Sequence, residues 1–154
     1  MNKNKKLGIN TTCVHVGEVK DEQFKGAVSP IYMSTSYAFD NVAIKRYPRY
    51  YNTPNQEMLC KKIAALENTE DALIFSSGMA AISSAMLAFL KRGDHVVIQQ
   101  VIYGGTYNFI VSEFDKYGIE YSFTESDKVE DFIPLIKKNT KILYIETPSN
   151  PLLG

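Results

Sequence analysis

The sequence has few of the residues that several protein classes require. Its 154 residues contain no tryptophan, two cysteines and two histidines. Cys13 and Cys60 lie far apart in unlike surroundings, so we expect two reduced, cytosolic thiols and neither a disulfide nor a metal site. His15 has no partner at a metal-binding spacing, and we expect it to have a structural role.

A charge excess and long apolar segments are also missing. Lysine and arginine together number 17, as do aspartate and glutamate, so no overall field would hold a nucleic acid or an anionic membrane. The one basic run, Lys3 to Lys6, is expected to be a solvated terminus, and no signal-peptide core follows it. No apolar segment is long enough to cross a bilayer. We therefore expect a cytoplasmic protein with no nucleic-acid or membrane partner.

Two common phosphate-binding motifs are absent as well. The chain has no G-x-x-x-x-G-K-[ST] sequence, and no G-x-G-x-x-G follows a predicted strand. These absences exclude a P-loop and a dinucleotide-binding fingerprint, and they argue against a nucleotide-binding α/β domain.

Residues 1–53 differ from the rest of the chain. The stretches Thr11 to Gly17 and Ser29 to Phe39 are polar and aromatic with little regular period, and we expect them to be extended. So long a segment without regular elements is unusual inside a compact domain. It predicts an N-terminal arm that packs on something else, such as another subunit.

After residue 53 the pattern becomes regular. Thr53, Pro54 and Gln56 predict a helix start with a capping box, and Leu59, Ile63 and Leu66 give that helix an apolar face. Further predicted segments alternate between strands and helices. The predicted strands are Asp71–Phe75, His95–Ile98, Glu120–Thr124 and Lys141–Ile145, and the predicted helices are Met79–Leu90, Tyr103–Tyr117 and Val129–Lys137.

This alternation predicts an α/β fold with a mainly parallel sheet. The helix from Met79 is apolar nearly all round, which predicts burial against the sheet, and Gly93 is placed to cap it in the left-handed region. Ligands of such sheets bind at the carboxyl ends of the strands. The segments at those ends are Ser76–Met79, Gln100–Thr106 and Glu146–Pro151.

The residues at these ends suit a phosphorylated aromatic ligand. Ser76, Ser77 and Gly78 open a helix whose first N–H groups have no partner, which favours an anion, although a plain serine-capped turn fits the pattern as well. Tyr103 stands before two glycines and can offer a ring face to a flat ligand. The stretch from Arg46 to Asn52 contributes two arginines and three tyrosines, which suit a phosphate or a carboxylate, or else form a solvated loop.

Taken together and in order, these segments resemble the Cys/Met-metabolism family of pyridoxal-phosphate (PLP) enzymes, the trans-sulfuration enzymes. The resemblance covers nearly the whole chain. It rests on the sequences Thr12–Gly17, Ser29–Tyr32, Tyr47–Arg49 with Asn52, Ser76–Ala81, Val101–Thr106 and Glu146–Pro151. It implies an N-terminal arm, residues 1–53, and an incomplete PLP-binding large domain, residues 54–154, of an aspartate-aminotransferase-like (fold type I) enzyme.

The resemblance also implies roles for individual residues. The cofactor phosphate would be held by Ser77, Gly78 and Met79, and by Tyr47 and Arg49 reaching across a subunit interface. Tyr103 would stack on the pyridine ring and take part in proton transfer. Asn150 would bond the phenolic oxygen of the cofactor, and Glu146 nearby would be a further cofactor-binding residue. No metal is implied.

The family's Schiff-base lysine and the aspartate that holds the pyridine nitrogen have no equivalent in these 154 residues. The resemblance therefore implies that the chain is a fragment and inactive by itself. The whole enzyme would be a homotetramer, a dimer of dimers, that cleaves a carbon–sulfur bond in a sulfur amino acid as a cystathionine lyase or methionine γ-lyase. The alternatives are a γ-replacement enzyme (cystathionine γ-synthase or O-acetylhomoserine sulfhydrylase) and a non-catalytic assembly module.

Overall fold

The computed structural model describes residues 7–153, and the chain divides into two compact units with the boundary between Ile74 and Phe75. The basic run Lys3 to Lys6 lies outside the described residues. Each unit is described by itself. The assignment of residues 1–53 to an arm and 54–154 to a cofactor domain stays a prediction.

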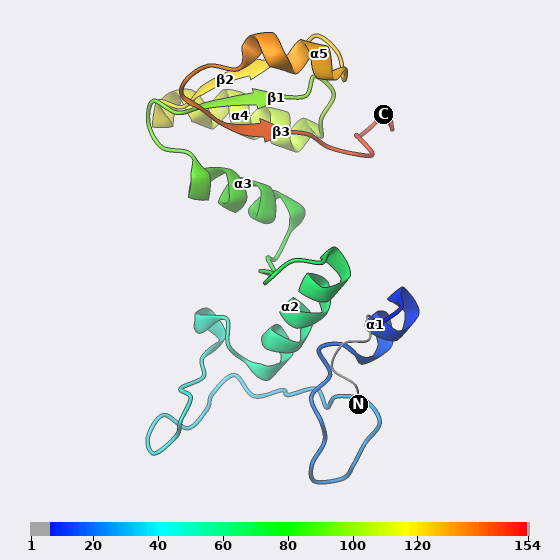
Figure 1. Cartoon of the computed structure of the whole chain (residues 1–154). Coiled ribbons are helices and arrows are strands. Elements are labelled where there is room, and N and C mark those ends of the chain that lie inside the picture. Colours follow the sequence, from blue (N-terminus) through cyan, green and yellow to red (C-terminus); the bar gives the residue numbers. More distant parts are fainter. Residues whose placement is uncertain (1–6, 154) are drawn as a thin grey trace. The chain divides into compact units, whose positions relative to one another are not determined.

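From residue 7 on, the first unit contains the helices α1 (Ile9–His15) and α2 (Pro54–Glu67) and a short 3-10 helix, η1 (Pro48–Tyr50) (Figure 1). The extended conformation expected from Thr11 is therefore wrong as far as His15. Packing of α1 on α2 stabilises a helix of only 7 residues, which local propensity would not sustain. Residues 16–47 form no helix or strand, in agreement with the lack of regular elements expected from their sequence.

The start of α2 is the one that the sequence predicted. Thr53 precedes Pro54 in the first helical position, and the Gln56 side-chain oxygen accepts a hydrogen bond from the Thr53 N–H at 3.2 Å. The predicted apolar face is wrong: Leu59 and Ile63 are exposed. The buried residues of α2 are instead Cys60, which lies beside Tyr51 and residues 71–73, and Ala64.

The second unit is built on a parallel sheet of β1 (His95–Ile98), β2 (Glu120–Phe123) and β3 (Thr140–Tyr144), in the order β2-β1-β3 (Figure 1). Its helices are α3 (Gly78–Phe89), α4 (Gly104–Tyr117) and α5 (Val129–Phe132), which is followed by the 3-10 helix η2 (Ile133–Leu135). The predicted α/β architecture is confirmed. The predicted helix to Lys137 ends early because Pro134 has no N–H to continue the α-helical pattern.

The core of this unit lies between β1 and two helices. Val96 and Ile98 point to the same face of the sheet and pack with Ile110 and Phe114 of α4 and Met86 of α3. All of these side chains are buried. All four residues of the central strand β1 are buried, so both of its faces are covered.

Three expectations for this region are wrong. Asp71–Phe75 is neither a strand nor buried, because no strand among the described residues pairs with it. Only Met86 is buried within α3, since one face alone packs on α4 and β3. Gly93 has a left-handed φ of 85°, but α3 ends earlier at an extended Leu90, so Gly93 shapes the turn before β1 and caps no helix.

Candidate functional site

At the N-terminus of α3, the backbone N–H groups of Gly78 and Met79 donate to no residue that the structure describes. Ser77 is its N-cap, and the Ser77 Oγ accepts a hydrogen bond from the Ala80 N–H at 3.1 Å. The N–H groups of Gly78 and Met79 have no acceptor in the first turn. A Cβ added at Gly78 would have no atom within 4 Å, so a ligand can approach this backbone closely. The serine cap and the anion site, which the sequence left as alternatives, are both compatible with this geometry.

Glu146 ties together the loops that follow β1 and β3. Its Oε2 accepts a hydrogen bond from the Tyr103 N–H at 2.7 Å, and its Oε1 accepts from the Tyr144 hydroxyl at 2.7 Å and the Thr106 hydroxyl at 3.2 Å. The Glu146 N–H in turn donates to the Gln99 side-chain oxygen at 3.1 Å. One carboxylate thus fixes the backbone of the loop that carries Tyr103.

Tyr103 is the N-cap residue of α4, and its side chain is 46% exposed. The ring lies against the backbone of Gly105: a Cβ at Gly105 would come within 2.4 Å of the Tyr103 Cε1. A side chain at this position would therefore displace the ring. The second of the two glycines after Tyr103 thus leaves room for the aromatic side chain.

Thr106 links this loop to the N-terminus of α3. It is fully buried, and its Oγ1 lies 3.8 Å from the Met79 Sδ. Through Thr106, the predicted site residues Met79, Tyr103 and Glu146 are gathered at one end of the sheet. Asn150 is exposed, four residues beyond Glu146, and its side chain bonds to no residue that the structure describes.

Tyr144 is the one group at this site with a strongly shifted pKa. Partial burial, with the hydrogen bond to Glu146 as a second cause, raises the pKa of the Tyr144 phenol to about 12. Both effects disfavour a phenolate, the second because the carboxylate is already negative. Tyr144 therefore remains a hydrogen-bond donor to Glu146 over the whole physiological range.

Tyr47 and Arg49 belong to the first unit, where both are exposed. Tyr47 packs edge-to-face on Tyr50, with ring centroids 5.4 Å apart. The two arginines of this stretch differ in their surroundings. Arg46 forms an ion pair with Glu57 at 2.8 Å, whereas the Arg49 guanidinium bonds to no residue within the described part of the chain. Arg49 is the one with donors to offer a ligand.

Several residues that shape the site were not singled out from the sequence. Gln99 directly follows β1, and the rule that strand ends carry ligand groups could have found it. Thr106 belongs to a recognised motif but had no assigned role. Tyr144 is the last residue of β3, and alternation along the strand does not distinguish a functional hydroxyl from a packing ring.

Comparisons with known proteins place the chain among enzymes of one family. Residues 10–154 match the family model described as "Cys/Met metabolism PLP-dependent enzyme". The chain is 38% identical over 160 residues to an L-methionine gamma-lyase of Fusobacterium nucleatum subsp. polymorphum, and 39% identical over 150 residues to the cystathionine beta-lyase MetC of Bacillus subtilis. These alignments cover 97% and 95% of this chain but 40% and 38% of the relatives.

A solved structure gives the same result. The crystal structure of metB from Corynebacterium glutamicum superposes with a TM-score of 0.88 at 37% identity, covering 96% of this chain and 39% of that one. The chain thus spans about two fifths of the length of the relatives it matches, and its fold is the N-terminal part of theirs.

Proposed function

The chain belongs to the Cys/Met metabolism family of PLP-dependent enzymes, and we propose that it forms the phosphate- and ring-binding part of a carbon–sulfur lyase acting on a sulfur amino acid. One observation carries the proposal. Glu146 joins the Tyr103 loop to the end of β3, and Thr106 joins that loop to Met79 at the open N-terminus of α3.

The residues present fit a phosphorylated pyridine. The N–H groups of Gly78 and Met79, with the Ser77 hydroxyl, would hold the phosphate at the positive end of the α3 dipole. Tyr103 would stack on the ring and move a proton at the substrate, and Asn150 would bond the phenolic oxygen. Bound PLP supplies an electron sink that stabilises negative charge at the substrate α-carbon.

Glu146 was expected to bind the cofactor. Its two oxygens already accept three hydrogen bonds from the chain itself, so we propose that it acts on the cofactor through Tyr103, by fixing the loop. Tyr47 and Arg49 would complete the phosphate site of a neighbouring subunit, which requires a homo-oligomer, proposed to be a dimer of dimers in the cytoplasm.

We further propose that the 154-residue chain has no turnover by itself, because the lysine motif of the family is absent from it. Elimination is favoured over γ-replacement since the two relatives named above are lyases. A cystathionine assay on the purified chain with added PLP should release no thiol and no 2-oxo acid. Turnover would contradict the proposed inactivity.

A second candidate function is a non-catalytic assembly module. Four large apolar side chains of the first unit are each at least 75% exposed: Phe24, Val28, Ile31 and Met33. A partner that covered these side chains would remove their apolar surface from water. Co-purification with a full-length homologue would support this role, and a chain that stays alone when mixed with one would contradict it.

Binding of the cofactor phosphate can be tested on the chain as it is. Pyridoxine 5′-phosphate is a suitable probe because it has no aldehyde and cannot condense with surface lysines. Calorimetric titration should give saturable binding of pyridoxine 5′-phosphate and at least tenfold weaker binding of pyridoxine, which has no phosphate. Equal affinities would contradict the proposed phosphate site.

A further inference from the structure

We propose that Asn52 and Gln56 are positioning residues that hold the Tyr–Arg loop, defined as Tyr47 to Arg49, in the conformation that presents Tyr47 and Arg49 to a phosphate. This inference rests on the proposed function, which assigns a cofactor phosphate to these two side chains. Neither Asn52 nor Gln56 would touch the ligand.

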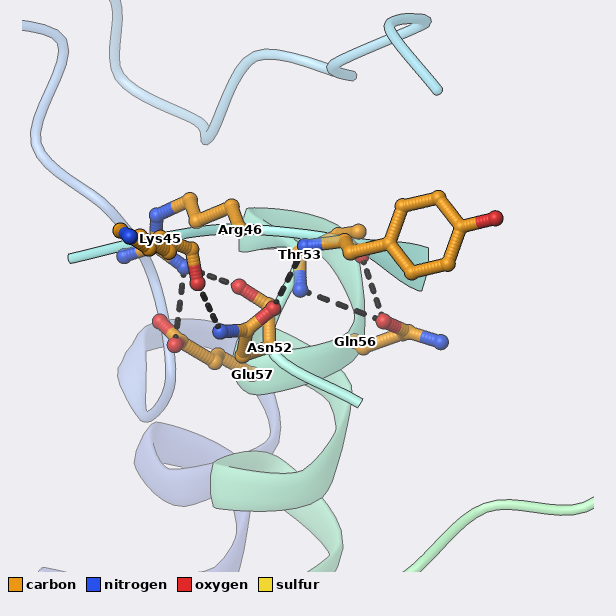
Figure 2. A network of polar contacts seen from close by, with 7 residues as sticks. Lys45, Arg46, Asn52, Thr53, Gln56 and Glu57 are labelled. Carbon is orange, nitrogen blue, oxygen red and sulfur yellow. Dashed lines mark hydrogen bonds and ion pairs between the residues drawn. The ribbon is translucent and has the colours of Figure 1, made fainter. Parts of the chain in front are cut away.

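Asn52 bonds to the backbone on both sides of Arg46. Its Nδ2 donates to the Lys45 carbonyl at 2.7 Å, and its Oδ1 accepts from the Tyr47 N–H at 2.9 Å (Figure 2). The amide uses one donor and one acceptor, so neither an aspartate nor an alanine can replace both bonds. Asn52 thereby fixes the backbone at Tyr47, where the Tyr–Arg loop begins.

Gln56 fixes the same loop to the first turn of α2. Its Nε2 donates to the Pro48 carbonyl at 3.0 Å. Its Oε1 accepts from the Thr53 N–H and from the Thr53 hydroxyl, the latter at 2.8 Å (Figure 2). Gln56 therefore has two roles. Its Oε1 completes the capping box of α2, and its Nε2 holds Pro48, the centre of the Tyr–Arg loop.

Arg46 closes the network and leaves Arg49 available. The Arg46 guanidinium donates to the Asn52 carbonyl and pairs with Glu57 at 2.8 Å (Figure 2). Tyr51, in the left-handed region with φ 57°, ends η1, and its hydroxyl donates to the Ile74 carbonyl at 2.7 Å. The backbone around the loop is thus held at several points, while the Arg49 side chain remains exposed.

The physical consequence is preorganisation. A loop that is already ordered loses less conformational entropy when it binds, so affinity improves without any new contact to the ligand. Removing the bonds from Asn52 or Gln56 should weaken phosphate binding while leaving Tyr47 and Arg49 in the chain.

Matched variants separate positioning from helix capping. Gln56→Glu keeps an acceptor for Thr53, since glutamate also serves in capping boxes, but loses the donor to Pro48. Gln56→Ala loses both. Asn52→Asp keeps the acceptor for Tyr47 and loses the donor to Lys45, and Asn52→Ala loses both. Arg49→Ala is the reference for loss of the ligand group itself.

Each variant is titrated with pyridoxine 5′-phosphate and with pyridoxine. We expect Asn52→Ala and Gln56→Glu to bind the phosphorylated probe about tenfold more weakly than wild type, with pyridoxine binding unchanged and with unchanged helix content by circular dichroism. The Tyr47 amide proton should exchange with solvent at least tenfold faster in Asn52→Ala, because its acceptor is gone.

The outcomes distinguish the inference from the proposed function. If wild type prefers pyridoxine 5′-phosphate and Arg49→Ala does not, the proposed function stands. Wild-type affinity in Asn52→Ala and Gln56→Glu would then overturn the positioning role. A loss in Gln56→Ala that Gln56→Glu does not share would assign Gln56 to helix capping alone. If wild type itself shows no phosphate preference, the proposed function fails first and the positioning role fails with it.

Discussion

The Glu146 carboxylate accepts a hydrogen bond from the backbone N–H of Tyr103 at 2.7 Å, across 43 residues of sequence. The residue expected to touch a cofactor thus holds the loop that carries the stacking ring. Its other oxygen accepts from Tyr144 and Thr106, so the site depends on one side chain with three donors around it.

Replacing Glu146 with alanine should destabilise the second unit. Three donors would lose their acceptor, and Thr106 is fully buried, so we expect a loss of about 1–3 kcal/mol in the free energy of unfolding. Urea unfolding followed by circular dichroism measures it. Glu146→Gln is the matched control and should cost less, because its oxygen can serve Tyr103 while the two hydroxyls rotate to accept from the amide. An alanine variant as stable as wild type would show that these bonds contribute nothing.

Gly78→Ala should weaken phosphate binding without harming the fold. The added Cβ meets no atom of the chain within 4 Å, and alanine is a better helix residue than glycine, so stability should be equal or greater. The methyl group would stand where the phosphate approaches Gly78 and Met79. We expect about tenfold weaker binding of pyridoxine 5′-phosphate by calorimetry, with pyridoxine unaffected. An unchanged affinity would place the phosphate elsewhere.

His95 should make the stability of the second unit depend on pH. Burial is the main cause that lowers the pKa of His95, and its ring nitrogens lie 2.8 Å from the Thr140 Oγ1 and 3.0 Å from the Ser122 Oγ. The unfolded state therefore binds the proton more readily than the folded state. The stability that depends on neutral His95 is fully present above the ordinary histidine pKa of 6.5 and declines as the pH falls below it.

The measurement is the urea midpoint between pH 7.5 and 5.5. The midpoint should decline over this range in wild type and stay flatter in His95→Gln, which cannot titrate. The pKa of Glu18, lowered to about 2 chiefly by its hydrogen bond with Lys62, keeps this carboxylate charged throughout the window. A wild-type midpoint independent of pH would contradict the prediction.

The two free cysteines should react at different rates. Cys13 is exposed, whereas Cys60 is buried in α2. A thiol reagent added to the native chain should modify Cys13 quickly, and Cys60 only after denaturation, because access limits the reaction. Counting released chromophore before and after adding urea measures this. Two fast thiols in native conditions would contradict the burial of Cys60, and Cys13→Ser identifies which thiol is fast.

Local signals in the sequence were enough to predict much of the second unit. Helix α4 ends at Tyr117 as predicted, and Gly118 caps it in the left-handed region with φ 67°, since glycine adopts this conformation without steric cost. The capping box at Thr53 and Gln56 was read in the same way. Alternating strands and helices predicted the parallel sheet, because a right-handed helical crossover is what joins parallel neighbours.

What the sequence could not determine depends on contacts between distant residues. Helix α1 exists because α2 packs on it, Asp71–Phe75 is not a strand because no strand pairs with it, and Arg46 and Arg49 differ only because Glu57 lies near one of them. The sequence by itself determined which chemical groups the site contains and the ends of most elements, since propensity and capping act within a few residues. Only the tertiary structure decided which groups bond to each other, as Glu146 does with Tyr103, because a hydrogen bond depends on distances that the folded chain alone sets.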